Sequence, residues 1–187
     1  VHPASRADET PAGTLVIIGG SERFSQREIW EEIVASAGGR GARIAVIPAA
    51  NGDPLRKGGW VVSTLNKCGA EAFLVPLAWV KVPQDPAVVA CDPEWVSRVR
   101  DASGVFFIGG AQDRITRALY AADGLQSPML EAIWEVYRKG GVIAGTSAGA
   151  AVMSRVMYRD APSVLATLHG GVRMGREIDQ GLGFLHE

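Results

Sequence analysis

Short apolar runs alternate with amphipathic stretches along most of the chain. Each run is rich in β-branched or aromatic residues and ends at glycine or proline, a pattern typical of strands covered on both faces, as in a parallel sheet. Five such strands are predicted: Thr14–Ile18, Arg43–Ile47, Ala72–Pro76, Val105–Ile108 and Gly141–Ala144.

The stretches between these runs carry helix signals. Ser25 and Glu28 have the spacing of a capping box, Phe24 and Ile29 that of a hydrophobic staple, and an apolar face then continues to Gly38-Gly39. Further helices are predicted at about Gly58–Asn66, after the N-cap Asp92-Pro93, over Asp113–Ala122, and after the N-cap Ser127-Pro128 as far as Gly140. Beyond Tyr158 the pattern weakens, and 160–179 is expected to form loops with a short strand or two.

This alternation of strand and helix predicts an α/β fold, a mainly parallel sheet with helices on both faces. We expect one domain over 14–187, preceded by a flexible polar lead at 1–13. Ligands of such sheets bind beyond the carboxyl ends of the strands. Three strands end there in glycine-rich turns, at Gly19-Gly20, Gly109-Gly110 and Gly145–Gly149.

Composition removes several classes of function. The formal net charge is −1 and no Lys/Arg cluster appears, which argues against a nucleic-acid partner. No apolar run reaches the about 20 residues that cross a bilayer, so no membrane partner is expected. Cys68 and Cys91 lack metal-site spacing and suit either a disulfide or two buried small side chains, and we favour structural roles. No metal or cofactor is expected.

The polar lead before the first strand suits a mature terminus left by signal-peptide removal. It predicts a secreted or periplasmic protein. A trimmed tail would look the same, so a cytoplasmic location remains the alternative.

The segment Gly145-Thr146-Ser147-Ala148-Gly149 follows an apolar strand and precedes residues that can begin a helix. A serine on such a sharp turn projects its Oγ above the sheet, and the next N–H, that of Ala148, can stabilise an oxyanion. We therefore predict Ser147 as a nucleophile. The alternative is a turn of small residues that serves only close packing.

Gly109-Gly110-Ala111-Gln112 ends another strand. The N–H of Gly110 is a candidate second oxyanion donor, and Gln112 a candidate for contacting substrate. Gly19-Gly20-Ser21-Glu22 can line the same crevice. In both cases the glycines can also simply end a strand.

A serine nucleophile needs a base and a group that orients it. His2 lies in the polar lead and is set aside, while His169 and His186 both follow the serine in chain order. His169 is the first candidate base, and Asp160 a candidate orienting acid. A surface or packing role is the alternative for each.

Together these motifs resemble those of the cyanophycinase family, which is related to the aspartyl dipeptidases. The resemblance covers Thr14 to the C-terminus and rests on the extended serine block Gly145–Ser154 and on three further segments: Gly19–Glu22, Gly109–Gln112 and Gly181-Leu182-Gly183-Phe184-Leu185. It implies a flavodoxin-like three-layer sandwich of the class I glutamine amidotransferase-like type. It also implies metal-free hydrolysis of cyanophycin, a poly-aspartate with arginine on each side-chain carboxyl, to β-aspartyl-arginine through an acyl-enzyme on Ser147, with Gln112 contacting substrate.

Two departures from the family pattern matter. Ala111 stands where the family usually has aspartate, which removes an acidic group. The family's catalytic histidine lies in an Asp-Gln-His-Phe motif shortly after the Gly-Leu-Gly block, where this sequence ends at Glu187. We expect that a segment beyond Glu187 supplies the base, as part of a longer protein or as a companion chain after cleavage. These residues alone are then expected to be unstable, with an unpaired sheet edge.

Two alternatives stay open. The first is an aspartyl dipeptidase acting on short Asp-X peptides, and the second is a non-catalytic relative that has lost its base. A glutamine amidotransferase proper is disfavoured because those enzymes carry cysteine at the position of Ser147. A homodimer fits the family, but no residue demands it.

Overall fold

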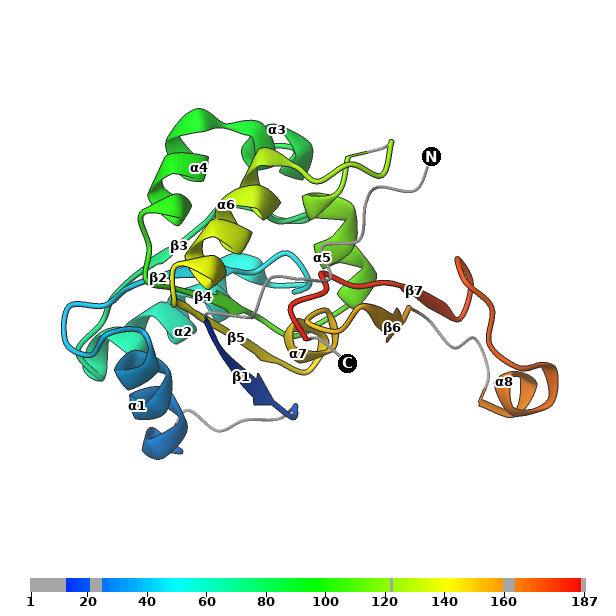
Figure 1. Cartoon of the computed structure of the whole chain (residues 1–187), viewed down its shortest axis with the longest axis horizontal. Coiled ribbons are helices and arrows are strands. Elements are labelled where there is room, and N and C mark those ends of the chain that lie inside the picture. The colour runs from blue at the N-terminus through cyan, green and yellow to red at the C-terminus, as the bar shows by residue number, and fades with distance from the viewer. Residues whose placement is uncertain (1–12, 21–24, 122, 160–163, 186–187) are drawn as a thin grey trace.

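The central element is a parallel sheet, seen in Figure 1 across the middle of the molecule. The computed structural model describes residues 13–20, 25–121, 123–159 and 164–185. The sheet has five strands in the order β1-β5-β4-β2-β3. Their bounds are β1 Thr14–Ile18, β2 Arg43–Ile47, β3 Glu71–Leu74, β4 Gly104–Phe107 and β5 Val142–Thr146. The predicted strands are confirmed, with ends that differ by up to two residues.

Alternating side chains of the strands fill two cores, one on each face of the sheet. In β2, Ile44 and Val46 pack on one face, whereas Ala45 and Ile47 pack on the other. The first face is covered by α1 (Arg27–Ser36) and α2 (Pro54–Lys67). The helices on the second face are α3 (Pro86–Cys91), α4 (Pro93–Arg100), α5 (Gln112–Leu119), α6 (Pro128–Arg138) and α7 (Ala148–Ala151). This is the predicted three-layer α/β sandwich.

The strand order places the switch of direction between β2 and β4. Counted from β2, the order β3-β2-β4-β5 repeats the 2-1-3-4 arrangement of flavodoxin-like sheets, and β1 takes the fifth place beside β5. All four strand pairs are parallel, so their carboxyl ends meet at one edge. The three glycine-rich turns follow β1, β4 and β5 at this edge.

Two of the predicted helix starts are confirmed in detail. The Asp92 carboxylate accepts hydrogen bonds from the N–H groups of Glu94 (2.9 Å) and Trp95 (3.5 Å). The Ser127 hydroxyl accepts one from the N–H of Leu130 at 3.2 Å. Each N-cap is followed by proline, whose missing N–H costs nothing at the first helical position.

The predicted capping box of α1 is wrong. Gln26, and not Ser25, is the N-cap, and no side chain caps the helix there. The helix forms without a side-chain cap because Trp30, Ile33 and Val34 bury its apolar face against the sheet, and this packing stabilises it. Phe24, the other half of the predicted staple, lies outside the described residues.

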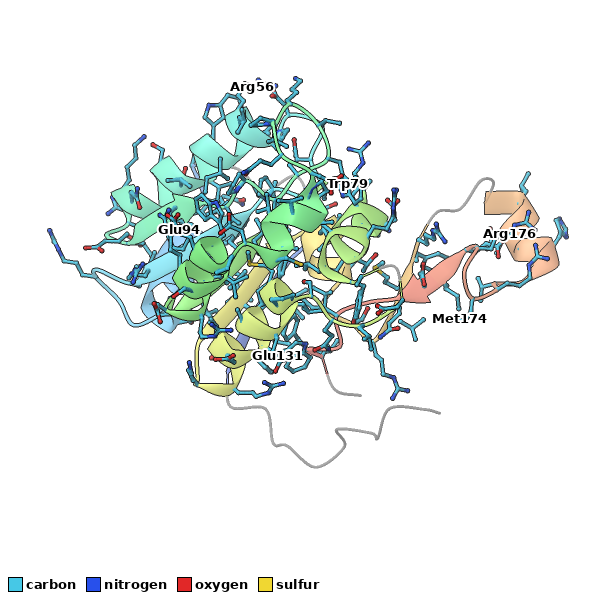
Figure 2. The ribbon with its side chains drawn as sticks, turned by 90° about the horizontal axis from the view of Figure 1, so that it is seen from above. Arg56, Trp79, Glu94, Glu131, Met174 and Arg176 are labelled. Atoms are coloured by element: carbon cyan, nitrogen blue, oxygen red, sulfur yellow. The ribbon has the colours of Figure 1, made fainter. Side chains whose placement is uncertain are left out.

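The region after Tyr158 holds more helix than expected. β6 (Val156–Tyr158) and β7 (Ile178–Gln180) form an antiparallel pair, which confirms the short strands. Between them lies α8 (Val164–Gly170), where only loops were predicted. Leu165 and Leu168 lie one turn apart on this helix and are 68% and 75% exposed, so the helix does not bury these two side chains. β6, α8 and β7 form an arm that extends away from the sheet, with Met174 and Arg176 far from the body (Figures 1 and 2).

The segment Gly181–Leu185 runs from the arm back to the body. Leu182 N–H donates to the carbonyl of Val152 at 2.6 Å, and Leu185 N–H donates to that of Met153 at 2.8 Å. Phe184 is fully buried against Trp134 and Tyr137 of α6, with ring centroids 4.4 and 5.5 Å away. The segment therefore contacts both the residues just after α7, through backbone hydrogen bonds, and α6, through Phe184.

Both cysteines are free thiols, which excludes the disulfide alternative within this structure. Cys68 is half-buried, but Cys91 is exposed, so the expectation of two buried small side chains is wrong for Cys91.

Among the described helices, none is long and apolar enough to cross a membrane. Of the lead at 1–13, only Gly13 is described.

Candidate active site

Ser147 lies at the carboxyl edge of the sheet between two glycine turns. It directly follows β5, while Gly20 follows β1 and Gly109 follows β4, the two strands that flank β5. A Cβ built on Gly20 would stand 3.3 Å from Cβ of Ser147, and one built on Gly109 would stand 3.1 Å from it. Any larger residue would crowd the serine, whose side chain remains exposed between these turns.

The backbone of Ser147 is strained. Its φ of 52° and ψ of −114° place a non-glycine residue where L side chains rarely occur, at a cost of about 1–3 kcal/mol. Ser147 N–H donates to the carbonyl of Ile18 at 3.0 Å, and its own carbonyl accepts from the N–H groups of Ala150 and Ala151 at 3.0 and 2.9 Å. Neighbouring backbone on both sides therefore holds the turn.

The glycines of the Gly145–Gly149 block are required by close approach of backbone. A Cβ on Gly145 would collide with the carbonyl of Gly149, and a Cβ on Gly149 with the carbonyl of Phe107. The chain thus folds sharply from β5 into α7 and packs α7 directly on β4. The strand–turn–helix order predicted from the sequence is present around Ser147.

Two backbone N–H groups, one in the turn of Ser147 and one in the turn after β4, are the candidate anion donors predicted from the sequence. Within the part of the chain that the structure describes, neither the N–H of Gly110 nor that of Ala148 has a hydrogen-bond partner. α7 has only four residues, so its macrodipole is small and the N–H itself carries the electrostatic effect. These are the two donors that the sequence predicted for an oxyanion hole.

The loop between β2 and α2 supports the Gly109-Gly110 turn. Nδ2 of Asn51 donates to the carbonyl of Gly109 at 2.9 Å, and Ala111 N–H donates to the carbonyl of Ala50 at 3.0 Å. Sequence reasoning missed Asn51. The available signal was a polar residue just past the carboxyl end of a parallel strand, where site residues gather.

Gln112 is the first residue of α5, immediately after the turn. Its Nε2 donates to the carbonyl of Tyr158 at 2.7 Å, which joins α5 to the base of the arm. The amide is therefore engaged by protein in this structure.

The candidate bases and acids do not gather at Ser147. His169 lies on α8, is exposed, and belongs to the arm that extends away from the sheet (Figure 1). Among the described residues, α8 therefore lies on the arm and not at the carboxyl edge of the sheet that holds Ser147, and the role of His169 as a base stays a prediction. His186, Asp160 and Ser21-Glu22 lie outside the described residues.

A charged group flanks the site on the side of β2 and β3. Asp53, the N-cap of α2, pairs with Arg56 and with Lys81, whose Nζ lies 3.3 Å from its carboxylate. The hydrogen bond from Arg56, with a further one from Lys81, lowers the pKa of Asp53. Figure 2 shows Arg56 and Trp79 on this side of the molecule.

Among the described residues, no three His, Cys, Asp or Glu side chains are grouped to hold a metal ion.

Curated relatives carry one name in common. A cyanophycinase from Nostoc sp. (strain PCC 7120) is 33% identical over 150 residues, which is 79% of this chain and 46% of the relative. A cyanophycinase from Geminocystis herdmanii is 32% identical over 147 residues, which is 78% of this chain and 50% of the relative. The chain therefore spans about half the length of the curated relatives that it matches.

Solved structures share the fold. A peptidase from an acI-B1 Actinobacterium superposes with a TM-score of 0.69 at 22% identity, over 95% of this chain and 66% of that one. A peptidase E-like protein from Listeria monocytogenes EGD-e superposes with a TM-score of 0.57 at 14% identity, over 92% of this chain and 75% of that one. The family model of peptidase family S51 matches residues 15–167. This chain belongs to peptidase family S51.

Proposed function

We propose that the protein carrying this sequence is a serine-type peptidase that hydrolyses cyanophycin to β-aspartyl-arginine, with Ser147 as its nucleophile. The observation that carries the proposal is the position of Ser147. It stands on a strained turn, exposed, between two glycine turns and beside two backbone N–H groups that have no partner. Strain of this kind persists only where surrounding structure maintains it, and it gathers at functional sites.

The reaction proceeds in two halves. Oγ of Ser147 attacks the scissile carbonyl carbon while its proton passes to a base, and the oxyanion that forms accepts hydrogen bonds from the N–H groups of Gly110 and Ala148. Collapse expels the amine, which takes the proton from the base, and leaves an acyl-enzyme. Water activated by the same base then attacks the ester and releases Ser147. Each oxyanion donor contributes on the order of 10²–10³ in kcat.

The base comes from outside the described residues in this proposal, since His169 lies on the arm. A segment beyond Glu187, whether continuous or a companion chain, is the proposed source. Gln112 is the proposed substrate-contacting residue, acting through its Oε1 while Nε2 is bound to Tyr158. The proposed location remains secreted or periplasmic.

Cyanophycin is proposed as the substrate because several curated relatives are named cyanophycinase, at 29–33% identity. The test uses the full-length purified protein on cyanophycin granules and on short Asp-X peptides. Clearing of granules with release of β-aspartyl-arginine, abolished by Ser147→Ala, is the expected result. Cleavage of the short peptides alone would replace this substrate by that of an aspartyl dipeptidase. Undiminished activity of Ser147→Ala would refute the nucleophile.

A further inference from the structure

Both ends of the Asn51 amide bind backbone. Its Nδ2 donates to the carbonyl of Gly109 at 2.9 Å, and its Oδ1 accepts from the N–H of Asp53 at 2.8 Å. The second bond is local and orders the loop that enters α2. The first joins residues 58 apart in sequence, so it spans from the end of β2 to the end of β4.

The Gly109 carbonyl and the Gly110 N–H belong to one peptide unit. Peptide units are planar, and the described chain contains no cis bond, so these two groups point in opposite directions. Whatever holds the carbonyl oxygen of Gly109 therefore also sets the direction of the Gly110 N–H.

Few other contacts fix the orientation of the peptide unit between Gly109 and Gly110. Neither residue has a side chain, and Gly110 has a φ of +152°, so rotation of the unit meets few steric barriers. The neighbouring peptide is fixed on the same loop, because Ala111 N–H donates to the carbonyl of Ala50 and the Gly110 Cα lies against that carbonyl. Asn51 is the side chain that bonds the rotating unit itself.

We propose that Asn51 is a positioning residue that keeps the Gly110 N–H, and not the Gly109 carbonyl, directed at the oxyanion. This inference rests on the proposed function, in which Gly110 is an oxyanion donor. If the bond is lost, the unit can turn and present a carbonyl oxygen to a developing negative charge. Rotation then removes a hydrogen-bond donor and adds a repulsion to the oxyanion, while binding of the substrate in the ground state, where the scissile carbonyl is neutral, changes little.

The test compares Asn51→Asp with Asn66→Asp in the full-length protein. Asp at 51 keeps the acceptor for Asp53 N–H but loses the donor to Gly109. Asn66, in the last turn of α2, is a matched control because its Oδ1 accepts from the N–H of Ala72 at the amino end of β3, at 2.7 Å. The readouts are kcat, KM and the thermal midpoint. Asn51→Ala, which loses both bonds, is the second variant.

The expected result is a kcat lowered on the order of 10²-fold in both Asn51 variants, with KM and the thermal midpoint of Asn51→Asp nearly unchanged and Asn66→Asp active. A normal kcat in Asn51→Asp would overturn the inference, as would an equal loss in Asn66→Asp. A loss confined to Asn51→Ala would also overturn it, since the bond to Asp53 would then be the one that matters.

Failure of the underlying function gives a different result. If Ser147→Ala keeps its activity, the nucleophile is wrong whatever the Asn51 variants do. If Ser147→Ala is inactive and Asn51→Asp is not impaired, the nucleophile stands and only the role of Asn51 falls.

Discussion

At the scale of single residues, the site depends on where side chains are absent. Ser147 adopts its strained conformation beside Gly20 and Gly109, and the turn itself closes because Gly145 and Gly149 let backbone meet backbone. The four glycines serve two purposes. Gly145 and Gly149 allow the fold of the turn, whereas Gly20 and Gly109 leave room around the serine.

Gly20→Ala tests whether catalysis needs the free space around Ser147, apart from any effect on the stability of the fold. Its methyl group would stand 3.3 Å from Cβ and 3.5 Å from Oγ of Ser147, so the serine must shift, and kcat/KM should fall about tenfold or more. Gly19→Ala is the control, because its Cβ meets nothing within 4 Å. Steady-state kinetics and thermal melts of the pair check this. Equal activity of the two variants would show that space around Ser147 is not limiting.

At the scale of elements, some sequence signals were sufficient to predict a helix or strand and its ends, and others were not. The buried strands and the Asp92 and Ser127 caps were predictable because local composition and local hydrogen bonds agree there. The start of α1 was not, since burial of Trp30 overrides the Ser25–Glu28 signal. Asn51 escaped prediction because its partner, Gly109, is distant in sequence, and only the fold brings the two loops together.

Two adjacent glycines in α2 test how the helix packs on the sheet. Gly59 faces open space, so Gly59→Ala should stabilise the protein by about 0.5–1 kcal/mol through helix propensity. A Cβ on Gly58 would press on the Leu74 side chain of β3, so Gly58→Ala should lose that gain or destabilise. Urea unfolding of both variants measures the difference. A larger gain for Gly58→Ala would mean that α2 does not pack on β3 as described.

Tyr120 links α5 to the segment that returns from the arm. Its hydroxyl donates to the carbonyl of Gly181 at 3.1 Å and accepts from Nε2 of Gln180 at 3.3 Å. Burial raises the pKa of Tyr120 above its ordinary value, and the bond from Gln180 opposes this only in part. The folded protein therefore keeps this proton at a pH where the unfolded chain releases it.

The stability that Tyr120 contributes should be complete below about pH 10 and be lost as pH rises through the raised pKa of the folded state. Tyr120→Phe should cost about 1 kcal/mol at neutral pH and show a shallower decline above pH 10. Unfolding free energies from pH 7 to 11 check both statements. An equally steep alkaline decline in the variant would assign the effect to other groups, such as Tyr137.

At the scale of the whole molecule, the sheet has an open edge. β1 is the outer strand beside β5, and Ile17 on it is 54% exposed. Unpaired N–H and C=O groups with an apolar side chain promote pairing between chains. Within the described sheet β1 and β3 are the outer strands, and the instability expected of these 187 residues alone stays a prediction.

Ile17→Lys should reduce self-association of these 187 residues, because a charge on an edge strand opposes pairing. Leu55→Lys is the matched control, since Leu55 is 51% exposed but lies on α2, where no strand edge is available. Light scattering against concentration distinguishes them. An equal effect of both substitutions would indicate that net charge, and not the edge of β1, governs association.

The fold and the position of Ser147 at the carboxyl edge of the sheet thus followed from local patterns, whereas a base beside Ser147 did not. Alternating apolar runs and the Gly145–Gly149 block define a layered sheet and one serine at its carboxyl edge. His169 follows Ser147 in the sequence, but the order of residues along the chain does not determine how far apart they lie in space. In the structure α8, which carries His169, lies on the arm. A triad is defined by geometry in space, which spacing along a sequence cannot supply.

The most direct measurement is peptide mass spectrometry of the full-length protein after incubation with a fluorophosphonate, which forms a stable phosphoryl ester on activated serines. We expect one stoichiometric adduct on Ser147, absent after heat denaturation and in Ser147→Ala, with loss of hydrolysis in parallel. An adduct on a different serine, or full hydrolysis with Ser147 unmodified, would contradict it.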